Sequence, residues 1–189
     1  MEIYLKGIAI AYSGALVTLQ ITIFAVIMGV IVGLFVALGK MSSIKLIRSI
    51  VSVYVGLLRG TPMVVQALII YYGLPMLLQD FGFNFRWESP VFASILVCGI
   101  NSSAYVAEII RGGLQAVDKG QMEAARSLGM KHSQAMRFII IPQAFRIILP
   151  ALGNEFITLL KETAVLSVIT LTEVTRKSML WVADRKSVV

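Results

Sequence analysis

Three stretches of this sequence contain no Asp, Glu, Lys or Arg: residues 7–39, 60–79 and 89–107. Each is as long as, or nearly as long as, the ~20 mostly apolar residues that a helix needs to cross a bilayer, and the first is clearly longer. The whole chain is 58% hydrophobic and 14% charged, whereas soluble domains carry about 25% charged residues. We therefore expect an all-α, polytopic membrane helical bundle and not a water-soluble fold.

The apolar pattern predicts one transmembrane domain over residues 1–189, with four spans near residues 8–39, 50–79, 89–110 and 151–171. The first apolar stretch is much longer than the about 7–15 residues of a signal-peptide core, so we assign it to the mature protein. Proline has no backbone N–H and interrupts helices. Pro62 and Pro75 should therefore kink the second span, and Pro142 and Pro150 should divide the segment before the fourth span into short helices.

The charged residues lie between the predicted spans and predict their orientation. Residues 40–48 carry three cations and no acid, and residues 111–137 carry five cations against two acids, whereas the loop at 80–88 has only Arg86 against two acids. Cytoplasmic loops of membrane proteins are enriched in Lys and Arg. We therefore expect the segment 111–137 in the cytoplasm and the N-terminus outside, and the net charge of +7 does not indicate a nucleic-acid partner.

The third predicted span becomes polar halfway along its length. Asn101, Tyr105 and Glu108 are spaced i, i+4 and i+7, so they share one helical face. Ionisable groups at membrane depth generally point into the bundle, where they border substrate pathways. This face is a candidate translocation path. Two alternatives stay open, namely hydrogen bonding between helices and, for Glu108, a local ion pair with Arg111.

The fourth predicted span carries a second group of candidate path residues: Thr158, Lys161 and Glu162. Lys161 could bind the carboxylate of an amino acid, and Glu108, Glu155 or Glu162 could bind an ammonium group or a basic side chain. An ion pair of Lys161 with Glu155 or Glu162 is the alternative.

The sequence does not favour an enzyme. It contains no phosphate-binding G-x-x-x-x-G-K-[ST] loop. Its one histidine, His132, and its one cysteine, Cys98, have no partners at the spacing of metal ligands. We expect no catalytic residue, no metal site and no cofactor in this chain.

The stretch EAARSLGM, residues 123–130, interrupts the apolar sequence with a short charged helix. Ala124, Ala125 and Leu128 would form a small apolar strip on a helix that ends at Gly129, a residue suited to helix C-termini. Helices that lie on a membrane surface favour larger apolar residues such as Trp and Phe. This composition therefore predicts close docking into a groove of a partner protein.

This segment resembles the EAA signature of the membrane subunits of bacterial ATP-binding-cassette (ABC) importers, with Ile141 where that pattern usually has leucine. The stretches RGTPMVVQ, AYVAEIIRGGLQAVDKGQMEAARSLGM, IIIPQAFRIILPALGNEFITLLKETAVLSVI and LTEVTRKS are similar to the polar amino-acid subfamily, of the histidine, glutamine and arginine type. The resemblance covers nearly the whole chain.

The resemblance implies a type I importer permease, a subunit that works as a homo- or heterodimer in the bacterial inner membrane. Separate ABC ATPase subunits would bind ATP, and an extracytoplasmic amino-acid-binding protein would deliver a polar or basic amino acid. The ATPase coupling residues implied are Glu123, Ala124, Ala125, Arg126, Leu128 and Gly129. A secondary transporter or channel subunit, or a membrane scaffold without transport activity, are the alternative functions.

The resemblance has one departure at the C-terminus. The family usually has a fifth span after the position of Glu173, whereas this sequence finishes with WVADRKSVV. We expect no helix there, interpret the ending as a truncation or a frame disruption, and expect the short form to insert but to assemble poorly with its ATPase.

Overall fold

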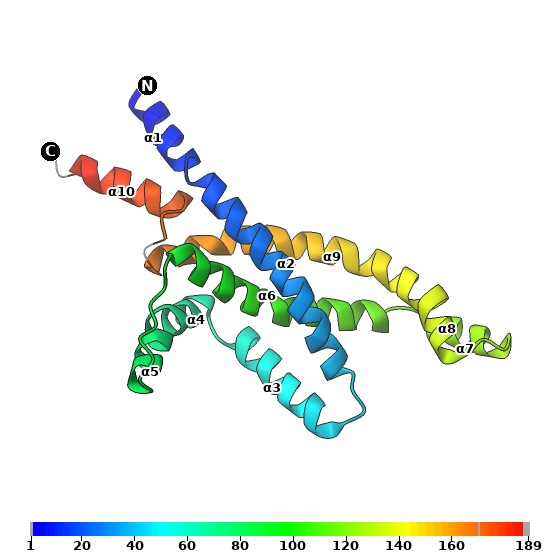
Figure 1. The fold of residues 1–189 in the computed structure, drawn as a ribbon. Helices are drawn as coiled ribbons and strands as arrows, with labels where there is room; N and C mark the ends of the chain where they lie inside the picture. The colour runs from blue at the N-terminus through cyan, green and yellow to red at the C-terminus, as the bar shows by residue number, and fades with distance from the viewer. Residues whose placement is uncertain (1, 170, 187–189) are drawn as a thin grey trace.

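The computed structural model describes residues 2–169 and 171–186, and every regular element in this range is a helix (Figure 1). The α-helices are α1 (Glu2–Tyr12), α2 (Ala15–Lys40), α3 (Lys45–Gly60), α4 (Met63–Leu68), α5 (Leu74–Asp80), α6 (Pro90–Gln115), α7 (Lys119–Ser127), α8 (His132–Ala135), α9 (Ile141–Glu162) and α10 (Val174–Lys186). The expected all-α architecture is confirmed.

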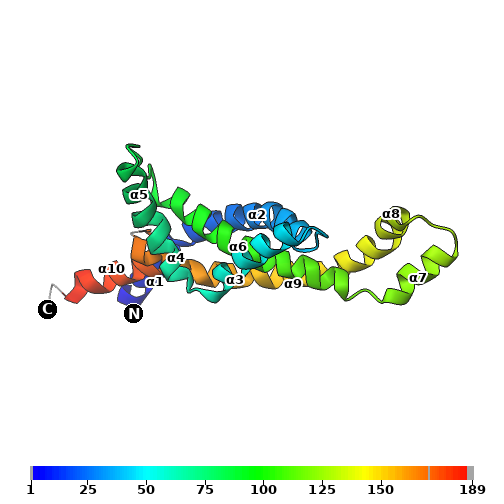
Figure 2. The ribbon, with the colours of Figure 1, turned by 90° about the horizontal axis from the view of Figure 1, so that it is seen from below.

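Within the described residues, four helical segments are long and apolar enough to cross a membrane: Leu5–Lys40, Met63–Asp80, Pro90–Gln115 and His132–Ile169. Helices α1, α5 and α10 lie at one end of the bundle, and α7 and α8 project from the other end (Figure 2). The long helices α2, α6 and α9 connect the two ends.

The second predicted span, residues 50–79, is not one kinked helix. Helix α3 ends at Gly60, Thr61 is extended at φ −117° and ψ 145°, and α4 begins after Pro62. Proline disfavours the helical conformation of the residue before it, so Pro62 holds Thr61 out of the helix. The prediction of a kink was therefore wrong, because the helix is interrupted at this point and α3 is a separate helix.

Pro75 and Pro142 are accommodated without a break. Each is the second residue of its helix, α5 or α9, and each follows a π-helical turn, at Ile69–Gly73 and Met136–Ile140. An α-helical N–H at position 75 would donate to the carbonyl of Tyr71, and proline has no N–H. The indole Nε1 of Trp87 donates to this carbonyl instead, at 3.0 Å.

The expected division of the chain at Pro150 is also wrong, because α9 continues from Ile141 to Glu162 with Pro150 inside it. The exposed position of Pro150 leaves room for its ring on the outer face of the helix. After Glu162 the chain narrows to a 3-10 helix, Thr163–Ile169, so the predicted span 151–171 is α-helical only over its first part. Thr170 lies outside the described residues.

The C-terminal segment forms a helix, contrary to the expectation from its charges. The buried carboxylate of Glu173 accepts hydrogen bonds from the backbone N–H groups of Thr175 and Arg176, at 2.6 and 2.7 Å, and so caps the start of α10. The Lys177 ammonium donates to the Ser13 hydroxyl at 2.7 Å, which ties α10 to the junction of α1 and α2. Residues 187–189 lie outside the described range, as do the side chains of Arg185 and Lys186.

Helices α2 and α6 form the closest packed pair of the bundle. Gly29 of α2 lies against the Ser102 side chain, and a Cβ atom added at Gly33 would stand 2.8 Å from the backbone oxygen of Ser103 and from the Val106 side chain. Small residues permit such close approach of helices in membranes. The apolar core is continuous with this contact and includes Ile21, Ala25, Val97 and Leu159.

We expect Gly33→Ala to destabilise the protein by about 1–3 kcal/mol, because the added methyl group meets backbone that cannot move away. Gly112→Ala is the matched control on the partner helix, since a Cβ there meets no heavy atom within 4 Å. Unfolding titrations in mixed micelles would measure both variants. Equal stabilities of the two would contradict the close contact.

Candidate functional site: a polar turn of helix α6 and the turn after α7

Asn101 is buried in the middle of α6 and reaches the break between α3 and α4. Its Nδ2 donates to Oε1 of Gln66 at 2.9 Å. The Gln66 amide then donates to the backbone carbonyls of Leu58 and Thr61, at 2.8 and 3.2 Å, and to the Thr61 hydroxyl at 2.9 Å. These carbonyls lack helical donors because the helix is broken. Asn101 and Gln66 together therefore satisfy the exposed backbone of the break.

The next two residues of the same turn bind two other helices. The Ser102 hydroxyl donates to Oε1 of Glu155 on α9 at 2.8 Å. The Ser103 hydroxyl lies 2.7 Å from the Tyr54 hydroxyl of α3. Asn101, Ser102 and Ser103 thus connect α6 with α4, α9 and α3. Hydrogen bonding between helices, which the sequence left open as an alternative, is present at this turn.

Tyr105 and Glu108 continue the predicted polar face toward the α7 end of α6. The Arg59 guanidinium lies over the Tyr105 ring, 5.2 Å from its centroid. The Glu108 carboxylate forms an ion pair with Arg111, at 2.7 Å, and a second one with Lys40 at the end of α2. The local pair with Arg111, which the sequence left open as an alternative, is present, and Glu108 also joins α2 to α6.

The candidates on α9 do not join this network. Thr158 and Lys161 are exposed and Glu162 is half-buried. Over the described part of the chain, no hydrogen bond or ion pair connects these three side chains to the polar residues of α6, and Lys161 pairs with neither Glu155 nor Glu162. The structure therefore brings Asn101, Tyr105 and Glu108 together on α6 and leaves the α9 group apart from them.

Sequence reasoning missed three partners of the α6 face: Gln66, Arg59 and Lys40. Gln66 stands alone among apolar residues of a predicted span, and this isolation is a signal that could have singled it out. Lys40 lies 68 residues before Glu108, so no local pattern relates the two.

Helix α7 has defined ends. The Asp118 carboxylate accepts a hydrogen bond from the Gly120 N–H at 2.7 Å and caps its N-terminus. At the other end, the Met130 N–H donates to the Ala125 carbonyl and the Gly129 N–H to the Arg126 carbonyl. This pair of bonds is a Schellman motif. Gly129 adopts φ +85°, so the expected helix C-terminus at this glycine is confirmed.

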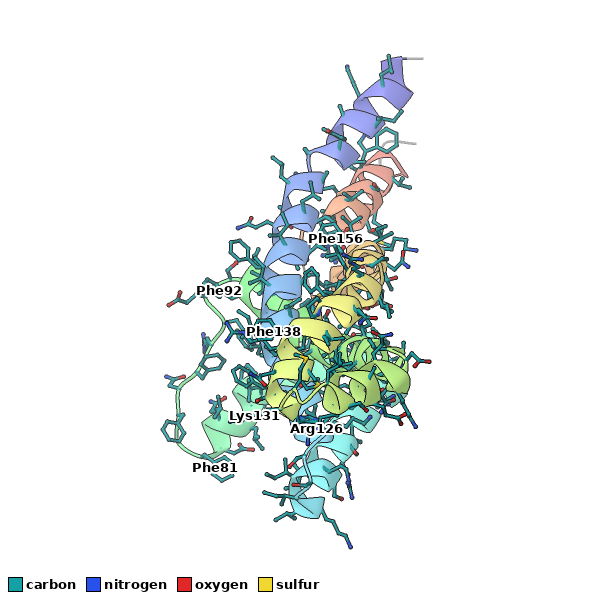
Figure 3. The ribbon with its side chains drawn as sticks, turned by 90° about the vertical axis from the view of Figure 1, so that its right-hand side faces the viewer. Phe81, Phe92, Arg126, Lys131, Phe138 and Phe156 are labelled. Atoms are coloured by element: carbon teal, nitrogen blue, oxygen red, sulfur yellow. The ribbon has the colours of Figure 1, made fainter. Side chains whose placement is uncertain are left out.

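The predicted apolar strip on α7 divides between two environments. Ala125 is 2% exposed and packs within the protein, whereas Leu128 is 84% exposed at the tip of the turn. Glu123, Ala124, Arg126 and Gly129 are also exposed. Figure 3 looks onto this end of the molecule, where Arg126 and Lys131 lie near the same turn. An Arg126 N–H donates to the Met130 carbonyl at 2.8 Å and stiffens the turn.

Comparison with known proteins identifies the family. Residues 29–183 match the family described as binding-protein-dependent transport system inner membrane component. The chain belongs to this family. Among its relatives, the arginine transport system permease protein ArtQ of Bacillus subtilis (strain 168) is 42% identical over 165 residues, which cover 87% of this chain and 73% of ArtQ. The L-cystine transport system permease protein TcyB of the same organism is 39% identical and covers 87% and 68% of the two chains.

Solved structures agree with this assignment. A chain from the crystal structure of an amino acid ABC transporter with histidines is 54% identical, with a TM-score of 0.82 over 92% of this chain and 78% of that chain. A chain of the inward-facing MetNI methionine ABC transporter is 21% identical, with a TM-score of 0.64 over 86% and 75% of the two chains, and shares the fold.

Family membership decides among the functions that the sequence left open. The chain is a multi-pass membrane protein and a permease component of an ABC importer. It is therefore neither an enzyme in its own right nor a stand-alone secondary transporter, channel or scaffold. A permease of this kind works with ATPase subunits.

Proposed function

We propose that this chain forms the translocation path of a bacterial importer for polar amino acids, including basic ones. The names of its relatives support this substrate class, since they transport arginine and cystine and the similar solved transporter is described with histidines. Two permease subunits, identical or related, enclose the path in the inner membrane. An extracytoplasmic binding protein delivers the amino acid, with the N-terminus of this chain on the same outer side.

The turn after α7 is the contact with the ATPase, on the cytoplasmic side. The exposed Leu128 is the single observation that carries this proposal, because burial of this large apolar side chain in a hydrophobic pocket of a partner is favourable. The Schellman motif at Gly129 and the hydrogen bond from Arg126 hold the tip in one conformation. A rigid tip can transmit movement of the ATPase to α6 and α9. Glu123 and Ala124 lie on the exposed surface around it.

Gly129→Asp should uncouple ATP hydrolysis from uptake. A side chain at φ +85° costs about 1–2 kcal/mol, and the new carboxylate enters the apolar contact. Gly129→Asn is the matched control, because asparagine has nearly the same size as aspartate and a similar tolerance of this backbone conformation but carries no charge. We expect amino-acid uptake in membrane vesicles to fall at least ~10-fold with Gly129→Asp and clearly less with Gly129→Asn. Both variants should still insert into the membrane. Normal uptake and normal ATPase recovery with Gly129→Asp would refute the proposal.

In this proposal, six polar residues of α6 and α9 border the path: Asn101, Tyr105, Glu108, Thr158, Lys161 and Glu162. The connections of Asn101 and Glu108 described above mean that these two residues also hold the walls in place. Thr158, Lys161 and Glu162 have no such partners in the described structure, which leaves their polar atoms available to a solute.

Glu162→Gln keeps the size of the side chain and removes its charge. An amino acid held by that charge should lose about 1.5–3 kcal/mol of interaction, which corresponds to roughly 10–100-fold in apparent affinity. Glu88→Gln, in the exposed loop before α6, is the control and should leave uptake unchanged. Competition assays with a panel of radiolabelled amino acids would measure the effect. Unchanged affinity and selectivity with Glu162→Gln would assign this residue a structural role.

A further inference from the structure

Helix α3, Lys45–Gly60, has three distinct faces. Successive residues of a helix are separated by about 100°, so its side chains can be assigned to faces by position. The first face is turned inward: Val51 lies beside Gly39 of α2, the Tyr54 hydroxyl contacts Ser103 of α6, and Val55 and Leu58 are buried and half-buried on the same face. The second is exposed and apolar, with Leu46, Ile50, Val53 and Leu57. The third is exposed and polar, with Lys45, Arg48, Ser49, Ser52, Gly56 and Arg59. We name this third face the α3 stripe.

The α3 stripe reaches membrane depth. The Tyr54 hydroxyl bonds Ser103 and the Ile100 carbonyl, which lie near the middle of the candidate span Pro90–Gln115. Arg59 lies further along α3, and its guanidinium contacts Tyr105 of the same span. A cation in the hydrocarbon core costs at least ~2.5 kcal/mol. The stripe therefore does not face lipid, whereas the apolar second face of α3 does so without cost.

We propose that the α3 stripe lines the water-filled passage of the transporter, and that Arg59 provides the cation for a carboxylate of the solute. This inference rests on the proposed function, because it assigns one wall of the path and the charge of the group that this wall attracts. Among the described residues, Arg59 forms no contact ion pair, and the one carboxylate whose charge it influences, Glu155, is hydrogen-bonded to Ser102. Its contact with the Tyr105 ring holds the guanidinium in place and leaves its N–H groups available.

A tightly packed contact between two copies of α3 is the alternative occupant of this face. Ser52, Gly56 and Gly60 are four residues apart, a spacing that suits close helix packing. However, a symmetric contact would place Arg48 and Arg59 of one copy close to the cations of the other. Like charges in a region of low dielectric constant repel strongly. Water between the copies weakens this repulsion strongly, so the charge pattern favours an aqueous passage.

Cysteine accessibility tests the proposal directly. Ser49→Cys, Ser52→Cys and Gly56→Cys probe the stripe, and Ile50→Cys, Val53→Cys and Leu57→Cys are neighbouring controls on the apolar face. All are made in a Cys98→Ala background, because Cys98 is the one native cysteine. Membrane vesicles that contain the assembled transporter are treated with membrane-impermeant, charged methanethiosulfonate reagents. We expect the stripe positions to react at least ~10-fold faster than the controls.

The charge of the reagent tests Arg59. The anionic sulfonatoethyl reagent is compared with the cationic trimethylammonium reagent at Ser52→Cys, each rate being divided by its rate with a free thiol. The ratio of the normalised anionic rate to the normalised cationic rate should exceed one. It should fall several-fold with Arg59→Gln and be retained with Arg59→Lys. Low reactivity of Ile50→Cys in every background reports that the fold is intact.

Three outcomes would overturn the inference: equal rates on both faces, a ratio that Arg59→Gln leaves unchanged, or protected stripe cysteines that form disulfides between two subunits. The labelling does not depend on uptake. Loss of amino-acid uptake with the labelling pattern intact would therefore count against the proposed substrate class alone, and normal uptake without the pattern would count against the α3 stripe alone.

Discussion

The turn from Asn101 to Ser103 is the constraint on which the arrangement of this bundle depends. Its three side chains bind α4, α9 and α3, and Gly29 and Gly33 bring α2 onto its other side. Single hydrogen bonds between membrane helices contribute only about 0.6 kcal/mol on average. Their importance here is that they provide hydrogen-bond donors to the backbone carbonyls of the helix break. An unpaired backbone carbonyl at membrane depth costs several kcal/mol, and the break at Thr61 would leave such groups without Gln66 and Asn101.

This arrangement explains how a broken helix can serve a permease. Because the Gln66 amide satisfies the carbonyls of the break, α3 can run in a different direction from α4. Its polar face, the α3 stripe, is thereby exposed. The ion pairs of Glu108 with Lys40 and Arg111 fix the ends of α2 and α6 near the segment that leads to α7. A displacement of α7 by an ATPase would therefore reach α6 at Glu108 first and the polar turn second.

Local features of the sequence predicted local structure well. Gly129 follows an alanine-rich helix and adopts the left-handed conformation that glycine favours, so the end of α7 could be predicted from one short segment. The i, i+4, i+7 spacing likewise placed Asn101, Tyr105 and Glu108 on one face. Their partners could not be predicted, because Gln66 and Lys40 are 35 and 68 residues away and only the folded bundle brings them close. The prolines show the same limit, since α3 ends before Pro62, where Gln66 satisfies the freed carbonyls, whereas α9 continues through Pro150, whose position is exposed.

Hydrogen–deuterium exchange of the Asn101→Leu variant tests most directly whether the polar turn of α6 holds the broken helix. Leucine has nearly the same shape as asparagine but donates no hydrogen bond to Gln66. The account predicts that backbone amides of residues 57–66 exchange at least ~10-fold faster than in the unaltered protein, because local opening there becomes easier, whereas residues 119–130 around α7 stay unchanged. Unchanged exchange at residues 57–66, or an equal acceleration over the whole chain, would contradict it.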